Sequence, residues 1–174
     1  IPITVAGGIR SEKDAETLMK NGSDKLAINT ELFNNKKVGR DLIMKYGSQS
    51  IILSIQAKKI SSSSWEAYIN FGRDSTNVDV KEWVIEMSKY NFGELLLTSI
   101  DADGLSGGFD IELYEQVSKL IKIPLIACGG FGKLNHIKEL KNYVDVDAIS
   151  ISKALHYEKF KISEIKKYIK ELND

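Results

Sequence analysis

The chain has 174 residues, enough for one hydrophobic core and a single domain. Hydrophobic residues make up 43% of it and charged residues 28%, the balance of an ordinary globular protein. Lysine and arginine together number 24 and are matched by 24 aspartates and glutamates, so the formal net charge is zero. Nucleic acid and anionic membranes attract basic proteins, so this balance argues against either as the main partner.

The cysteine and histidine content indicates the compartment of the protein and bears on metal binding. A single cysteine, Cys128, has no partner for an internal disulfide, which is typical of a reducing compartment such as the cytoplasm. The two histidines, His136 and His156, lie far apart in the sequence, so a zinc site of the usual type is not expected. No apolar run approaches the ~18 residues of a membrane span, and no signal peptide is visible. We expect a cytoplasmic protein with neither a metal nor another cofactor.

Short β-branched runs alternate with amphipathic stretches along the chain. We expect strands at residues 3–6, 25–29, 51–57, 94–99, 124–128 and 148–152. We expect helices after a cap at Ser11 and at residues 38–46, 80–91, 111–121, 134–141 and 162–172. The strand runs do not alternate cleanly in polarity, which is typical of parallel strands buried on both faces. The order therefore predicts successive βα units.

An internal repeat favours a barrel over a doubly wound sheet. The segment IPITVAGG at residues 1–8 matches IPLIACGG at 123–130, and DKLAIN at 24–29 matches DAISIS at 147–152. The repeat interval holds four βα units, and a fold in which unit n resembles unit n+4 is a repeated half-barrel. We expect residues 1–174 to form one partial (β/α)₈ (TIM) barrel domain, with a small hairpin inserted at residues 58–79.

The chain opens on a buried strand pattern without a methionine, so we expect a longer parent. Six of eight βα units are then present, and two N-terminal units are missing. Six parallel units leave two open strand edges, so we expect the isolated chain to associate or aggregate.

Glycine pairs follow the first and fifth predicted strands, and polar residues follow the second and sixth. The pairs are Gly7-Gly8 and Gly129-Gly130, and the polar residues are Asn29-Thr30 and Ser152-Lys153. Paired glycines let backbone N–H groups approach an anion, and the next helix N-terminus adds a partial positive charge. Two such sites related by the repeat predict a small ligand with a phosphate at each end. The alternative is that the glycines only make tight turns.

Three further residues at strand ends are candidates for chemistry. Asp101 and Asp103 follow the fourth strand, where carboxylates can act as general acid and base or merely stabilise a turn. Gln56 ends the third strand and can orient a ligand but not transfer protons at neutral pH. At the opposite ends of the strands lie Asp24, Lys25 and Glu94, which are either solvated or meet a partner.

Five segments, in order over essentially the whole chain, resemble the cyclase subunit of imidazole glycerol phosphate synthase. They are IPITVAGGIR, DKLAINT, YGSQS, LLTSIDADG and IACGG. The resemblance implies a lyase of histidine biosynthesis that takes ammonia from a glutaminase subunit docked on the bottom of the barrel. The barrel cleaves and cyclises a bis-phosphorylated ribulosyl-formimino intermediate, giving imidazole glycerol phosphate and the aminoimidazole carboxamide ribotide AICAR.

The resemblance also implies roles for particular residues. Gly8, Asn29 and Thr30 match one phosphate site of the family. A second group matches the other phosphate site, with Asp103 as a supporting carboxylate; this group is Gly104, Gly130, Ser152 and Lys153. Lys25 and Glu94 match the charged gate of an ammonia channel, and Asp24 matches a partner contact.

The sequence departs from the family pattern at four positions. Gln56 replaces a principal acid-base aspartate, Ala6 a glycine of the phosphate loop, and Cys128 and Lys153 replace serines. A missing acid-base group can cost about 10²–10⁴-fold in rate. The exchange also fits a paralogue that supports an amidotransferase acting on a surface-polysaccharide sugar. Three hypotheses stay open: the histidine-pathway cyclase, this paralogue, and an inactive fragment.

Overall fold

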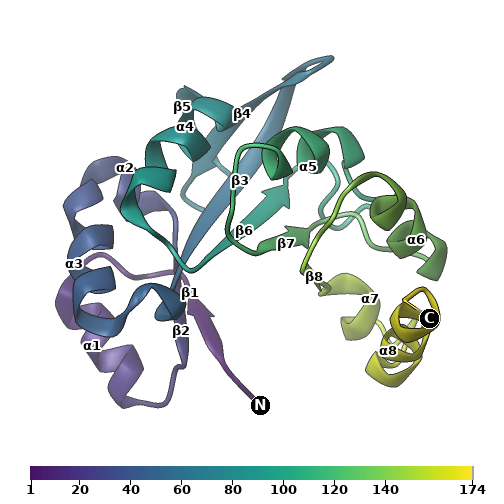
Figure 1. Cartoon of the computed structure of the whole chain (residues 1–174), viewed down its shortest axis with the longest axis horizontal. Coiled ribbons are helices and arrows are strands. Elements are labelled where there is room, and N and C mark those ends of the chain that lie inside the picture. Colours follow the sequence, from purple (N-terminus) through teal and green to yellow (C-terminus); the bar gives the residue numbers. More distant parts are fainter. Residues whose placement is uncertain (174) are drawn as a thin grey trace.

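The computed structural model describes residues 1–173. Six parallel strands follow one another in the order β1-β2-β3-β6-β7-β8 and form a sheet that is bent into an arc (Figure 1). The strands are β1 (Thr4–Ala6), β2 (Lys25–Ile28), β3 (Ile51–Ser61), β6 (Glu94–Ser99), β7 (Leu125–Cys128) and β8 (Ala148–Ser150). This is the arrangement of a TIM-type β/α fold, as the repeat predicts.

The helices line the convex side of the arc (Figure 1). They are α1 (Glu12–Lys20), α2 (Thr30–Asn34), α3 (Lys36–Tyr46), α4 (Val80–Met87), α5 (Ile111–Ser118), α6 (Leu134–Tyr143), α7 (Lys153–His156) and α8 (Ile162–Glu171). None of the helices within residues 1–173 has the length and apolar character needed to cross a membrane.

The predicted strands and helices are all present, with ends that shift by a few residues. The helix predicted at residues 80–91 ends at Met87 and tightens into a 3₁₀ turn before Asn91, whose φ is +56°. The helix predicted at residues 111–121 ends at Ser118. The short helices α2 and α7 were not predicted, because one turn directly after a strand is too short to show a helical period.

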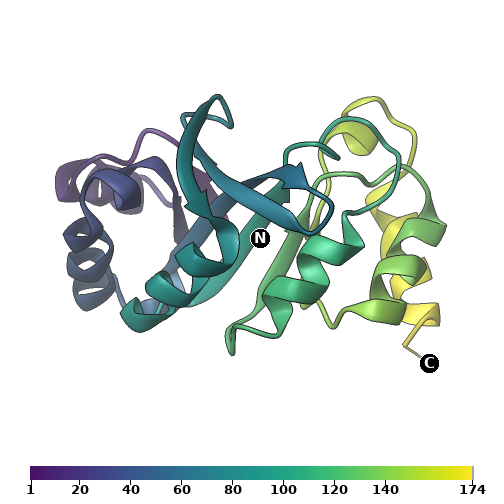
Figure 2. The same cartoon turned by 90° about the horizontal axis from the view of Figure 1, so that it is seen from above.

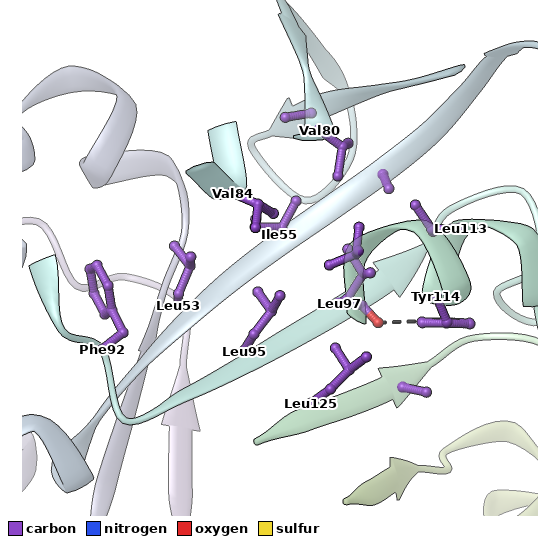
Figure 3. Packing of buried hydrophobic residues seen from close by; sticks show 14 of the residues in the cluster. Leu53, Ile55, Val80, Val84, Phe92, Leu95, Leu97, Leu113, Tyr114 and Leu125 are labelled. Carbon is purple, nitrogen blue, oxygen red and sulfur yellow. Dashed lines mark hydrogen bonds between the residues drawn. The ribbon is translucent and has the colours of Figure 1, made fainter. Parts of the chain in front are cut away.

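Residues of the central strands alternate between the two faces of the sheet. Leu53 and Ile55 of β3, like Leu95 and Leu97 of β6, are buried and pack under α4 and α5 (Figure 3). Ser54 and Gln56 of β3 face the concave side and are half-buried. The expectation that the strands are buried on both faces holds only in part: Ala27 of β2 and Ile52 of β3 are buried on the concave side, whereas alternate residues of β6 and β7 are only half-buried there.

The third strand is longer than its neighbours and turns back as a hairpin. Strand β4 (Ser64–Ile69) pairs antiparallel with the end of β3, and β5 (Asp74–Asp79) pairs antiparallel with β4; both extend beyond the parallel sheet (Figure 2). The turn between β3 and β4 falls within the serine run at residues 61–64. The hairpin therefore begins at the carboxyl ends of the parallel strands.

The internal repeat is visible as two equivalent clasps at the amino ends of the strands. The Asp24 carboxylate accepts a hydrogen bond from the Ile3 N–H at 2.6 Å, and the Asp24 N–H donates to the Ile3 carbonyl at 2.8 Å. In the second copy, the Asp147 carboxylate accepts from the Leu125 N–H at 2.8 Å, and the Asp147 N–H donates to the Leu125 carbonyl at 3.0 Å. Each clasp joins the start of one strand to the start of the next.

We predict that Asp147→Ala lowers the free energy of unfolding by about 1 kcal/mol, because it removes the side-chain partner of the Leu125 N–H. The matched control is Asp145→Ala, an exposed neighbour on the same loop, for which we expect a change within about 0.5 kcal/mol. Urea denaturation of both variants measures the difference. Equal losses would show that the clasp contributes nothing beyond its backbone bonds.

Candidate functional site

A cavity of 440 Å³ lies at the carboxyl ends of β1, β2 and β3. This size is typical of a small-molecule site, and the carboxyl end of the strands is where TIM-type folds bind their ligands. Its glycine, polar and aromatic lining consists of Gly7, Gly8, Arg10, Asn29, Thr30, Glu31, Asn34, Ser54, Gln56, Asn70 and Phe71.

The glycine pair after β1 borders open space. Gly7 and Gly8 have φ values of +91° and +72°, a conformation that other residues adopt only with strain. A Cβ at Gly8 would meet no atom within 4 Å, and one at Gly7 would meet only the Phe71 ring, at 3.7 Å. Apart from the Phe71 ring, no group outside the loop comes within 4 Å of these two positions, which leaves room for a ligand.

The first turn of α1 carries its own negative charge. The Asp14 carboxylate accepts hydrogen bonds from the Ser11 hydroxyl at 2.8 Å and from the Arg10 N–H at 3.1 Å. These bonds, that of Ser11 above all, hold the pKa of Asp14 below its usual range. The helix N-terminus therefore offers less positive potential to an anion than the sequence suggests, and Arg10 is the cation that lines the cavity.

Two amides form the floor of the cavity. The Asn29 side-chain N–H group donates to the Gln56 carbonyl oxygen at 3.1 Å and to the Tyr68 backbone carbonyl at 3.0 Å. The Asn29 Oδ1 is buried and has no hydrogen-bond partner among residues 1–173. Neither amide titrates, so this part of the site orients a ligand and does not exchange protons with it.

The second glycine pair has a different environment. A Cβ at Gly130 would lie 1.9 Å from the Gly108 carbonyl oxygen, and one at Gly129 would lie 2.7 Å from that of Ser99. These glycines are required by close backbone packing against the loop between β6 and α5. The two pairs are equivalent in sequence but not in structure.

The other residues predicted for the second phosphate site converge on the same loop. The Lys153 ammonium donates a hydrogen bond to the Gly104 carbonyl. Ser152 lies directly before α7 and acts as its N-cap residue. This group lies outside the 440 Å³ cavity, and its role in binding phosphate stays a prediction.

The two candidate carboxylates after β6 are both exposed and do not line the cavity. The Asp101 carboxylate accepts a hydrogen bond from the Lys59 N–H at 2.7 Å, and so holds the extension of β3. The Asp103 N–H donates to the Ser99 carbonyl at 3.0 Å, which fixes the turn. Acid-base roles for both residues stay predictions.

The hairpin is fastened to both halves of the sheet. At its base, the Trp65 indole donates to the Asp110 carboxylate at 2.8 Å, and the Lys59 ammonium pairs with Glu112 at 3.0 Å. At its tip, the Asn70 N–H donates to the Thr30 hydroxyl at 3.0 Å. The hairpin thus forms a wall of the first cavity while it is anchored beside the second glycine pair.

At the amino ends of the strands, Lys25 and Glu94 form an ion pair on the concave face. Their side chains are 31% and 20% exposed, respectively. The residues predicted for a charged gate are therefore brought together. The sequence predicts Asp24 as a partner contact. In the structure, its carboxylate accepts a hydrogen bond from the Ile3 N–H of the same chain.

Sequence reasoning missed six polar or aromatic residues that line the cavity, namely Arg10, Glu31, Asn34, Ser54, Asn70 and Phe71. Arg10 could have been found, because it ends the first glycine loop. Ser54 lies two residues before Gln56 and so shares its face of β3. The hairpin residues gave no signal, because their approach to the first glycine loop depends on a long-range contact.

The parallel β/α arrangement and the glycine-lined cavity at the strand ends define a small-molecule-binding protein of the TIM type. Residues 1–161 match the model of the family described as histidine biosynthesis protein. The chain belongs to this family, and the resemblance inferred from the sequence is confirmed.

Curated relatives agree with this assignment. The chain is 41% identical over 172 residues to the imidazole glycerol phosphate synthase subunit HisF of Dictyoglomus thermophilum, which covers 98% of this chain and 68% of that protein. It is 39% identical over 173 residues to the subunit HisF of Bacillus cereus, with 99% and 69% covered. It is also 39% identical over 172 residues to the subunit HisF of a Hydrogenobaculum species, with 99% and 68% covered.

The difference between the two glycine pairs gives a prediction. Gly8→Ala should lower the free energy of unfolding by about 1–2 kcal/mol, the cost of a left-handed backbone alone. Gly130→Ala should cost about 2 kcal/mol more, because the new methyl group overlaps the Gly108 carbonyl. Guanidinium denaturation of the two variants tests this order. A Gly8→Ala loss as large as that of Gly130→Ala would show that both loops serve packing.

Proposed function

We propose that this chain carries the cyclase activity of imidazole glycerol phosphate synthase in histidine biosynthesis. With ammonia as the co-substrate, it cleaves and cyclises the bis-phosphorylated ribulosyl-formimino intermediate and yields imidazole glycerol phosphate and AICAR. The observation that carries the proposal is the convergence of the first glycine loop with Asn29 and Thr30 on one cavity, in a chain of this family.

In this proposal, the phosphates occupy the two strand-end groups. Gly7, Gly8, Asn29 and Thr30 bind one phosphate. The other phosphate is bound by a group that comprises Gly104, Gly129, Gly130, Ser152 and Lys153. The Lys153 ammonium beside Gly104 supports the second assignment, because it supplies a positive charge there. Asp103 and Asp101 are the remaining acid-base candidates.

The domain and its partner are part of the same proposal. Residues 1–174 form one partial (β/α)₈ domain with its hairpin at residues 58–79, in the cytoplasm. A glutaminase subunit docks at the amino ends of the strands and delivers ammonia past Lys25 and Glu94. The ion pair on the concave face supports this placement, because it lies at the opposite end of the strands from the cavity.

We predict that Lys25→Met lowers glutamine-dependent turnover by about fivefold or more relative to turnover with free ammonia, because it disrupts the coupling between the two subunits. The control is Lys20→Met, which removes an exposed i,i+4 pair with Glu16 on α1 and should change neither rate. Steady-state assays with each nitrogen source measure the ratio. An unchanged ratio in Lys25→Met would contradict the gate.

A second candidate function is favoured by the amide floor of the cavity. Gln56 is hydrogen-bonded to Asn29. Because both side chains are amides, no proton can be exchanged at that position at neutral pH. This supports the alternative that the chain is a HisF-like paralogue that serves an amidotransferase acting on a surface-polysaccharide sugar.

The substitution Gln56→Asp separates the two candidates. If the chain is the cyclase, we predict that this variant turns over the ribulosyl-formimino substrate with ammonia up to about 10²-fold faster than wild type. Its rate should also depend on pH, because an aspartate titrates. Gln56→Asn is the matched control and should not gain activity. Failure of both wild type and Gln56→Asp to turn over the substrate would contradict the cyclase and favour the sugar-modifying paralogue.

A further inference from the structure

The turn that joins β4 to β5 carries an exposed aromatic residue in a strained conformation. Asn70, Phe71 and Gly72 have φ values of +51°, +62° and +75°. Glycine and asparagine tolerate this left-handed region, but a bulky side chain there is an outlier. Phe71 is also 79% exposed. The fold therefore keeps Phe71 in a strained backbone conformation and leaves its apolar ring exposed to solvent.

The residues on both sides of Phe71 are nevertheless held in place. The Asn70 N–H is bound to the Thr30 hydroxyl at 3.0 Å, and the Asn70 amide donates to the Asp74 carboxylate at 2.6 Å. On the other side, Gly72 packs so closely that an added Cβ would lie 3.2 Å from the Ile100 side chain. Both flanks of Phe71 are thus held by the fold.

The ring lies over the first glycine loop. Its edge would be 3.7 Å from a Cβ at Gly7, and the same cavity is lined by Gly8, Arg10 and Phe71. Backbone N–H groups and a guanidinium suit a phosphate, whereas an aromatic face suits a flat, weakly hydrated ring. Anion donors and an aromatic wall therefore border one cavity.

We propose that Phe71 is a specificity-determining residue that stacks on the planar heterocycle of a ribotide whose phosphate lies at Gly7 and Gly8. The inference rests on the proposed function, in which AICAR supplies both the phosphate and the heterocycle. Phe71 of the hairpin then selects the ligand by its heterocycle, and the glycine loop binds the phosphate of any ribotide.

The test compares two probes in the full protein. AICAR carries a ribose phosphate and a planar imidazole ring, while ribose 5-phosphate lacks the ring. Phe71→Asn should weaken AICAR binding by about tenfold, the usual effect of removing one stacking partner, and should leave ribose 5-phosphate binding within about twofold. Phe71→Tyr, which keeps the aromatic face, should restore AICAR binding. Calorimetric titration measures all of these affinities.

A matched control is present on the same hairpin. Ile60 is 57% exposed near the far end of the hairpin and does not line the cavity, so Ile60→Ala should change neither affinity. Because asparagine tolerates a positive φ, Phe71→Asn should melt no lower than wild type, and a binding loss then cannot be ascribed to unfolding. Equal AICAR affinity in wild type and Phe71→Asn, or an equal loss for both probes, would overturn the inference. A lack of turnover in a wild-type protein that binds AICAR through Phe71 would instead count against the proposed function alone.

Discussion

The register between β3 and β6 determines where every functional group of this chain lies. Ile52 is opposite Glu94, and Gln56 is opposite Thr98, so one set of alternate residues must face the helices and the other the concave side. The apolar set is buried under α4 and α5 (Figure 3), and a slip of one residue would expose it. The same constraint holds Glu94 at the amino end of the concave face and Gln56 at the carboxyl end. The ion pair and the cavity are therefore separated by the length of a strand.

A symmetric framework carries two unlike strand-end loops. The clasps of Asp24 and Asp147 show that the repeat is retained where strands begin. At the other end, the first glycine pair borders a cavity while the second packs against backbone. The hairpin of β4 and β5 contributes to the difference, because the turn between these strands forms a wall of the first cavity. The resulting cavity is bordered by backbone and guanidinium donors for a phosphate, by the paired amides of Asn29 and Gln56, and by the Phe71 ring.

The sequence predicted the features that depend on neighbouring residues. Strands, helices, the Ser11 cap and the glycine loops follow from local periodicity and local backbone demands, and the family resemblance followed from motifs in order. The inequality of the glycine pairs could not be predicted, because it depends on the contact between Gly130 and Gly108. The Trp65–Asp110 bond joins residues 45 positions apart and likewise leaves no local signal. The hydrogen bond from the Lys59 N–H to the Asp101 carboxylate also joins residues far apart in the sequence, so it could not be predicted either. The acid-base role of Asp101 stays a prediction.

In the proposed function, the strand ends of this chain bind a doubly phosphorylated substrate. Calorimetric titration of the full protein with the ribulosyl-formimino bisphosphate, beside a titration with its singly phosphorylated fragment AICAR, tests it most directly. We expect one substrate bound per chain, and tighter binding of the bisphosphate than of AICAR, because the second phosphate contacts the group of Gly104 and Lys153. Equal affinities for the two ligands, or no heat of binding for the bisphosphate, would contradict it.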